Sequence, residues 1–204
     1  MTLTEELKSA VATEWEGFER LMADSLISRS DLLNRINGYL LEASGKKLRP
    51  LLALVTAKAC SGSINPKAVA CAAVSELIHT ATLLHDDVVD GSDQRRGQLT
   101  VRKLFSSGAS LLMGDYWLTR AIHLLIKYGC PYEVLGIYSK SLEELAEGEI
   151  IQMELADSLR TTEDDYIQVI RRKTASLFIA SVKGPAIVSG ASDEVVSAME
   201  QYAY

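Results

Sequence analysis

Three aspartates end a long apolar stretch at LLHDDVVDGSDQRRG, residues 83–97. If this stretch is helical, Asp86 and Asp90 lie one turn apart on the same face. Two carboxylates at that spacing repel each other unless a cation lies between them. Oxygen ligands of this kind suit Mg²⁺, which keeps several waters and is usually completed by substrate phosphates. Asp86, Asp87 and Asp90 therefore form a candidate metal site. The alternative is a helix end that meets solvent, although acids near a helix C-terminus are unfavourable to the helix dipole.

An arginine pair, Arg95 and Arg96, follows the last of these aspartates by five residues. Guanidinium groups match phosphate oxygens with two parallel hydrogen bonds. An acidic pair followed by an arginine pair therefore indicates a diphosphate held from both sides, by a metal ion and by guanidinium groups. An isolated arginine pair is more often a solvated surface feature.

Two further features upstream could contact anions. The segment SGKKLRP carries Lys46, Lys47 and Arg49 between a glycine and a proline. It is either a second anion pocket or a charged surface loop, and it lacks the spacing of a Walker loop. His79 lies seven residues before Asp86, two helical turns away on the same face. A phosphate contact is plausible there, whereas a lone histidine on an apolar helix is usually a core residue.

A third cation, Lys173, stands next to the hydroxyl of Thr174 in RRKTASLF. Such pairs are common and by themselves carry little weight. The acids of the nearby segment TTEDDYIQ are assigned to helix capping instead of metal binding. Thr162 and Asp165 have the spacing of a capping box, and acids in a first helical turn are favoured by the dipole.

The elements that must position these residues are predicted to be helices, because no alternating strand pattern bounded by hairpin turns occurs. The predicted helices cover residues 3–27, 31–43, 49–60, 66–90, 109–128, 132–157, 163–183 and 193–204. The breaks fall at Gly45 and at SGSINP, GSDQRRGQ, YGCP and VSGAS. No internal repeat or low-complexity linker separates them. We predict one all-α domain, residues 1–204, of long helices joined by short loops.

Composition limits the class of protein. The net charge is -6, which argues against a nucleic-acid partner, since such proteins present a basic face. The acidic N-terminus has no apolar signal core, and no apolar run approaches the ~20 residues of a transmembrane segment. The three cysteines, Cys60, Cys71 and Cys130, match no metal motif. They indicate reduced thiols and a cytoplasmic location.

Together these segments resemble the trans-prenyl diphosphate synthase family, of the polyprenyl, long-chain type. The matching pieces, in the family's order, are GKKLRP, ELIHTATLLHDDVVDGSDQRRG, GDYWLTRA, EGEIIQ and KTASLF. The resemblance implies an isoprenoid-synthase-type bundle of long helices around a central cavity, and a homodimer. It covers the N-terminal two-thirds of such an enzyme, so the C-terminal helices are expected to be missing.

The resemblance also implies a reaction and roles for residues. The reaction is a Mg²⁺-dependent condensation of isopentenyl diphosphate with an allylic diphosphate. Asp86, Asp87 and Asp90 would hold the metal. By motif position, isopentenyl diphosphate would be bound by Lys46, Arg49, His79 and Arg96; the allylic diphosphate by Arg95, Lys173 and Thr174; and Gln152 would face the cavity.

One departure from the family is large. The family's second aspartate-rich motif, downstream of Lys173 and Thr174, does not occur before Tyr204. Three alternatives to an active synthase therefore stay open: a catalytically impaired short form, a non-catalytic partner subunit, and a class I terpene cyclase. The cyclase is disfavoured because it has less need for the basic residues assigned to isopentenyl diphosphate.

Residues just upstream of the first aspartate set product length in this family. Here Ala81 and Thr82 are small, and Ile78, Ser75 and Cys71 follow one and two turns deeper. No aromatic side chain blocks this stripe of the helix, so we predict a long product. Ala81→Phe should then shorten it. The alternative is that bulk from another helix closes the cavity.

Overall fold

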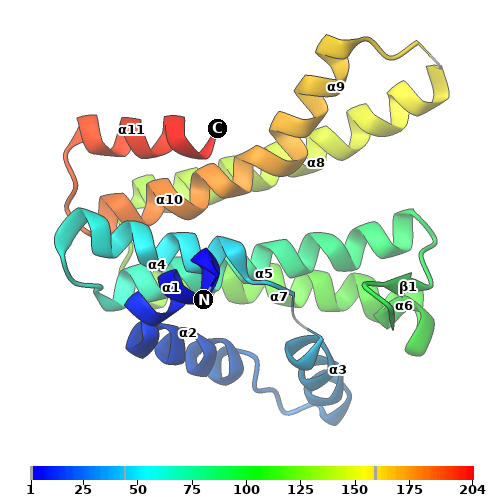
Figure 1. Ribbon diagram of the computed structural model, residues 1–204. Helices are drawn as coiled ribbons and strands as arrows, with labels where there is room; N and C mark the ends of the chain where they lie inside the picture. Colours follow the sequence, from blue (N-terminus) through cyan, green and yellow to red (C-terminus); the bar gives the residue numbers. More distant parts are fainter. Residues whose placement is uncertain (1, 44, 159) are drawn as a thin grey trace.

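The computed structural model describes residues 2–43, 45–158 and 160–204, without the side chains of residues 157 and 158, as a bundle of long helices (Figure 1). The N-terminal half contains α1 (Leu3–Ala10), α2 (Ala12–Ser25), α3 (Asp31–Glu42), α4 (Leu48–Ser61) and α5 (Pro66–Val89). The C-terminal half contains α6 (Val101–Leu104), α7 (Ser107–Lys127), α8 (Tyr132–Ser158), α9 (Glu163–Ile170), the π-helical turn η1 (Arg171–Ala175), α10 (Ser176–Val188) and α11 (Asp193–Ala203). The predicted all-α class is confirmed.

A short hairpin between α5 and α6 was not predicted. Strands β1 (Gln94–Arg95) and β2 (Gln98–Leu99) pair antiparallel, with Arg95 opposite Gln98. The two connecting residues, Arg96 and Gly97, both have positive φ, 53° and 80°. This is the backbone of a type I′ turn, which suits two-residue hairpins. Strands of two residues are too short to show alternation, so the prediction of a loop here was wrong.

Two predicted helices are divided in the structure. The helix predicted at 3–27 breaks at Val11, whose φ of -124° and ψ of 28° are not helical. The Val11 side chain is fully buried, so the break directs an apolar side chain into the core. The helix predicted at 163–183 is divided into α9 and α10 by η1, and α10 continues to Val188 with Pro185 inside it.

The core is centred on α5, which packs against α4, α7 and α10. Its buried face is rich in alanine, including Ala70, Ala72 and Ala73, and small side chains let neighbouring helices approach closely. Two buried polar side chains of the core form hydrogen bonds to neighbouring helices. The Trp117 indole donates to the Asn37 carboxamide oxygen at 2.8 Å, and Ser110 Oγ donates to the Leu84 carbonyl at 2.8 Å.

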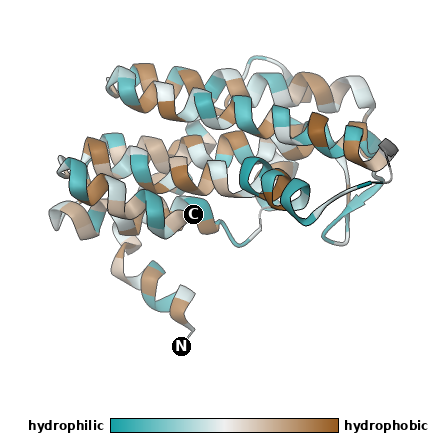
Figure 2. Ribbon diagram, turned by 90° about the horizontal axis from the view of Figure 1, so that it is seen from above, coloured by the Kyte–Doolittle hydropathy of each residue, from teal (hydrophilic) through white to brown (hydrophobic). Residues whose placement is uncertain are grey.

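Hydropathy alternates along most helices, as expected for helices with one buried face (Figure 2). By length and composition α5 alone of the described helices could cross a bilayer, but 67% of its most apolar window is buried inside the fold. This burial is that of a central core helix.

Candidate active site

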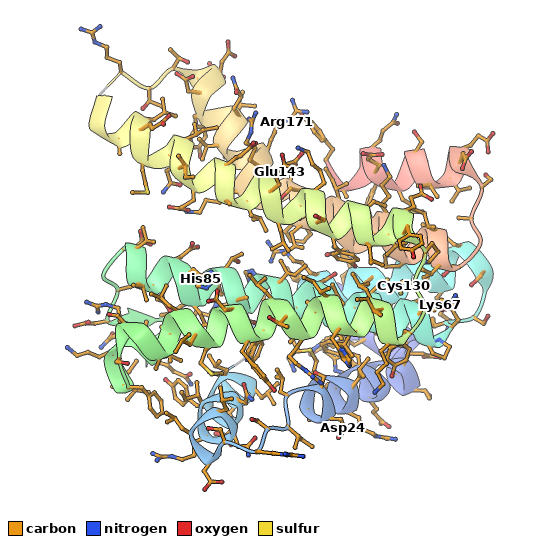
Figure 3. The ribbon with its side chains drawn as sticks, turned by 180° about the vertical axis from the view of Figure 1, so that it is seen from behind. Asp24, Lys67, His85, Cys130, Glu143 and Arg171 are labelled. Carbon is orange, nitrogen blue, oxygen red and sulfur yellow. The ribbon has the colours of Figure 1, made fainter. Side chains whose placement is uncertain are left out.

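The acidic end of α5 faces the middle of α8 and the turn η1. Asp86 is half-buried, and burial raises its pKa; the charges of Lys173, Glu149, Asp90 and Arg95 also act on it. Asp90 is the C-cap residue of α5, and its backbone N–H donates to the Asp86 carbonyl at 2.8 Å. The two carboxylates therefore lie one helical turn apart, as the spacing predicts. In Figure 3, His85 marks this end of α5.

Asp87 points in another direction, toward the hairpin. It is 4% exposed, and Arg95 Nε donates to its Oδ1 at 2.9 Å. Burial raises the pKa of Asp87 more than Arg95 lowers it. The structure thus pairs a predicted metal ligand with a predicted diphosphate ligand. This ion pair fixes the hairpin to α5. Both of its residues line a small cavity of about 80 Å³, whose lining does not include Asp86 or Asp90.

The hairpin presents Arg96 to a pocket of about 290 Å³. A Cβ atom at Gly45 would overlap the Arg96 guanidinium, so any other residue there would require the Arg96 side chain to move. The pocket is lined by Gly45, Lys46, Lys47, Leu48, Arg49, Glu76, His79, Arg96 and Phe178. It contains all four residues predicted to hold isopentenyl diphosphate: Lys46, Arg49, His79 and Arg96.

Two of the pocket's basic residues adopt strained backbone conformations. Lys47 and Arg96 have φ of 51° and 53°, in the left-handed region that non-glycine residues rarely adopt. Lys47 Nζ pairs with Glu19 Oε1 at 3.2 Å. The Arg49 guanidinium lies over the Phe178 ring at 4.2 Å from its centre, and its buried Nε has no hydrogen-bond partner. Strain of this kind persists where the surrounding structure holds it, often at binding sites.

His79 is neutral in this environment. Burial, followed by the charges of Arg49, Arg96 and Arg95, lowers its pKa to about 3. Its ring can therefore offer one N–H donor and one acceptor without adding charge.

A pH dependence of stability follows from His79. Between its usual pKa of 6.5 and about 3, the unfolded chain binds more protons than the folded one. Folding stability from this residue is therefore present above pH 6.5 and is lost as the pH falls. Between pH 7 and pH 4, we expect the free energy of unfolding of His79→Gln to fall less than that of the unmodified protein. Urea unfolding at each pH measures both values. Parallel curves would show that His79 is protonated equally in both states.

Lys173 lies on η1, opposite α8. Its ammonium forms an ion pair with Glu149 and donates to Gln152 Oε1 at 3.3 Å. Thr174 and Gln152 are exposed. Glu149 was missed as a site residue, although it belongs to the quoted segment EGEIIQ and precedes Gln152 by three residues. A π-helical turn within a helix often marks a functional site, and here it carries the predicted cation.

Gly148 allows this close approach of α8 to η1. A Cβ atom there would lie 2.9 Å from Arg172 Cβ and 3.1 Å from the Lys173 backbone nitrogen. We expect Gly148→Val to push η1 away from α8, break the Glu149–Lys173 pair and weaken binding of an allylic diphosphate by about tenfold, a loss of ~1.4 kcal/mol. Calorimetric titration would measure it. The matched control is Gly17→Val, on α2, where an added Cβ meets nothing within 4 Å; an equal loss in both variants would contradict the explanation.

The predicted product-length residues do not all line one cavity. Ile78 lines an apolar cavity of about 340 Å³ between α5, α7 and α8, together with Val74 one turn deeper. Ala81 is fully buried and Thr82 is half-buried, and neither lines this cavity. Tyr138 of α8 also lines it.

Tyr138 covers the deeper part of the helix stripe described above. It is 2% exposed, and its hydroxyl lies 3.0 Å from the Cys71 carbonyl oxygen and 3.1 Å from Ser75 Oγ. An aromatic side chain from another helix therefore meets the stripe that is free of aromatics within α5. The sequence favours no particular residue for closing the cavity from another helix, and only the structure identifies Tyr138 in this position.

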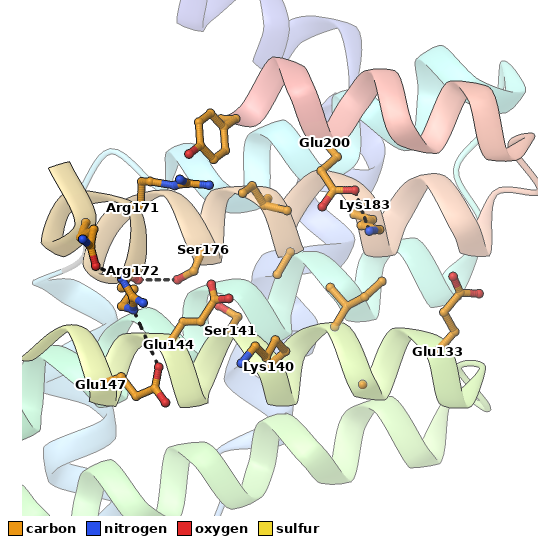
Figure 4. A pocket seen from close by; sticks show the side chains of 16 residues that line it. Glu133, Lys140, Ser141, Glu144, Glu147, Arg171, Arg172, Ser176, Lys183 and Glu200 are labelled. Carbon is orange, nitrogen blue, oxygen red and sulfur yellow. Dashed lines mark hydrogen bonds and ion pairs between the residues drawn. The ribbon is translucent and has the colours of Figure 1, made fainter. Parts of the chain in front are cut away.

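A larger cavity, about 890 Å³, lies elsewhere, among α8, η1, α10 and α11 (Figure 4). None of the predicted site residues lines it. Its lining includes four acidic and four basic side chains, and two ion pairs form among them. Lys183 pairs with Glu200 at 2.7 Å, and Arg172 pairs with Glu147 at 3.7 Å. Its charge is balanced, so it does not have the chemistry of a diphosphate site.

The donor set near α5 fits a magnesium ion in part. Within residues 2–43, 45–158 and 160–204, no three His, Cys, Asp or Glu side chains are gathered as a complete metal site. Asp86 and Asp90 supply two carboxylates on one face, and Mg²⁺ commonly binds one or two carboxylates and takes waters and substrate phosphates as its other ligands. The residues present therefore suit a metal that binds with a diphosphate.

Comparisons with known proteins identify the family of this chain. The family model described as "Polyprenyl synthetase" matches residues 30–204. Octaprenyl diphosphate synthase of Escherichia coli is 36% identical over 198 residues, 97% of this chain and 61% of the relative. A decaprenyl diphosphate synthase from Rhodobacter capsulatus superposes with a TM-score of 0.93 at 39% identity, covering 98% of this chain and 61% of that one.

A further solved structure carries ligands. The polyprenyl synthase from Caulobacter crescentus, complexed with calcium and isoprenyl diphosphate, superposes with a TM-score of 0.92 at 33% identity. It is matched over 98% of this chain and 60% of its own. The chain thus spans about three-fifths of the length of the relatives it matches.

Proposed function

Because this chain belongs to the polyprenyl synthetase family, we propose that it binds isopentenyl diphosphate and an allylic diphosphate and joins them into a polyprenyl diphosphate. The single observation that carries the proposal is the placement of two charged clusters along α5. At its end, Asp86 lies one turn from Asp90 and interacts electrostatically with Lys173. Two turns earlier, His79 lies beside Arg49 and Arg96.

The basic pocket suits isopentenyl diphosphate. Arg49, Arg96 and Lys46 supply positive charge to the diphosphate, and neutral His79 supplies a hydrogen bond. Phe178 holds the Arg49 guanidinium in place by stacking against it.

The second cluster suits the allylic diphosphate. Lys173 would neutralise charge that develops on the departing diphosphate, while Glu149 and Gln152 orient the ammonium. A bound Mg²⁺, held by Asp86 and Asp90, would supply further charge stabilisation for the leaving group. The apolar cavity beside Ile78 and Tyr138 would receive the growing chain and exclude water from the allylic cation.

The proposal is tested by incubating the protein with labelled isopentenyl diphosphate, an allylic diphosphate and Mg²⁺, and by following diphosphate release and prenyl products. Binding of each substrate is measured separately by calorimetry, because this chain is about three-fifths as long as its relatives. Binding without turnover would favour the impaired short form. Absence of both binding and products would contradict the proposal.

We also propose a homodimer. Large apolar side chains are exposed along α7: Leu112 at 69%, Ile122 at 50% and Ile126 at 62%. A second copy of this helix would cover them. Sedimentation velocity should therefore show a dimer, and Ile126→Glu should shift it toward monomer.

The three free thiols suit a reducing compartment, and we propose the cytoplasm.

A non-catalytic partner subunit is the second candidate. It predicts that activity appears only when a longer relative is added. A class I terpene cyclase is disfavoured, because it would not need the basic pocket of Arg49 and Arg96.

A further inference from the structure

A buried carboxylate lies inside the basic pocket. Glu76, on α5, is 7% exposed and lines both the pocket of about 290 Å³ and an adjoining cavity of about 80 Å³ toward the hairpin. Among the described residues that line the larger pocket, Glu76 is the one acid. A negative charge there opposes the binding of a diphosphate, so its presence calls for an explanation.

The groups around Glu76 come from several elements. Lys47 and Arg49 of α4 and Arg96 of the hairpin act on it through their charges. His79, one turn along α5, lines the same pocket and is neutral, and Phe178 of α10 is apolar. Glu19 of α2 reaches the pocket indirectly, through its ion pair with Lys47. Glu76 is therefore the counter-charge that the buried Arg49 and its neighbours have when no ligand is bound.

A bound diphosphate would replace Glu76 as the counter-charge of these basic residues. Its oxygens would pair with Arg49, Arg96 and Lys46, and the carboxylate would then share a buried pocket with a like charge. Burial already raises the pKa of Glu76, even though three cations lower it. A nearby anion raises the pKa of a carboxyl group further.

We propose that Glu76 is an exchangeable counter-ion, which balances the basic residues of the free pocket and takes up a proton when a diphosphate binds. One proton moves from solvent to the Glu76 carboxylate, and the neutral carboxyl group can then donate a hydrogen bond to a diphosphate oxygen. The inference rests on the isopentenyl diphosphate pocket proposed above. It adds a linkage between substrate binding and pH.

Calorimetric titration with isopentenyl diphosphate tests this linkage. The titration is repeated in buffers of different ionisation enthalpy, which gives the number of protons taken up on binding. We expect the unmodified protein to take up more protons, by up to one, than Glu76→Gln, which has the shape of the protonated residue. Uptake of one proton makes affinity fall by up to about tenfold per pH unit between the Glu76 pKa of the free protein and that of the complex, and Glu76→Gln should flatten this slope.

Controls separate the possible outcomes. Glu143→Gln removes an exposed carboxylate of α8, paired with Lys140 at 3.1 Å, and should take up the same number of protons as the unmodified protein. Equal uptake in the unmodified protein and Glu76→Gln, with both binding, would overturn the counter-ion inference and leave the proposed function standing. Absence of binding to either protein would instead refute the pocket itself.

A measurement without substitution covers the case in which Glu76→Gln does not fold. Glutamate side chains labelled with ¹³C in the unmodified protein should show one carboxyl signal that moves to the protonated position when isopentenyl diphosphate is added. Unchanged carboxyl signals in the saturated complex would overturn the inference.

Discussion

Asp86→Asn is expected to lower kcat for prenyl transfer by about a thousandfold, since removal of one preorganised charge at a reacting centre costs roughly that much. Asparagine has the shape of aspartate but not its charge, so the pair with Asp90 would no longer attract a divalent cation. Burial raises the pKa of Asp86, which means that the ionised carboxylate is disfavoured by the fold. The substitution should therefore leave the melting temperature unchanged or raise it.

The matched control is Asp115→Asn. Asp115 lies on α7, 69% exposed, with His85 Nε2 at 3.3 Å from its Oδ1. The Asp115→Asn substitution removes the same charge near the same end of α5, and kcat should stay within about twofold of the unmodified value. The measurements are kcat and the affinity for an allylic diphosphate with and without Mg²⁺. If Asp86→Asn kept more than a tenth of the rate, the proposed role of the pair would be wrong.

Replacing Tyr138 is expected to lengthen the product. Its ring lines the apolar cavity and its hydroxyl contacts Cys71 and Ser75, so it closes the route deeper along α5. Tyr138→Ala removes this barrier but should also cost about 3–5 kcal/mol of stability, as for other buried aromatics. Tyr138→Leu shortens the side chain with less loss of packing. In both variants we expect products longer by at least one isoprene unit, measured by chromatography of the dephosphorylated alcohols.

Two companion variants sharpen this test. Tyr138→Phe loses the contacts to Cys71 and Ser75 but keeps the ring, so product length should stay the same. Ile78→Phe fills the cavity from the opposite helix and should shorten the product. Ile78 suits this purpose better than Ala81, which does not line the cavity. Unchanged products in Tyr138→Leu would show that the barrier lies elsewhere.

The sequence alone determined the local parts of this protein. The positions of most helices follow from apolar periodicity, and the capping box of Thr162 and Asp165 is present as predicted. The placement of Asp86 and Asp90 one helical turn apart was also predictable, because residues four apart on a helix share a face whatever surrounds them.

Only the tertiary structure decided which charges meet. Asp87 pairs with Arg95 beside the small cavity next to the hairpin, Lys173 pairs with Glu149, and Glu76 lies among the basic residues of its pocket. Helix periodicity gives the face on which a side chain lies but not the neighbour that packs against that face. That neighbour depends on contacts between distant segments, such as Tyr138 with Cys71, and these are fixed only when the helices pack together.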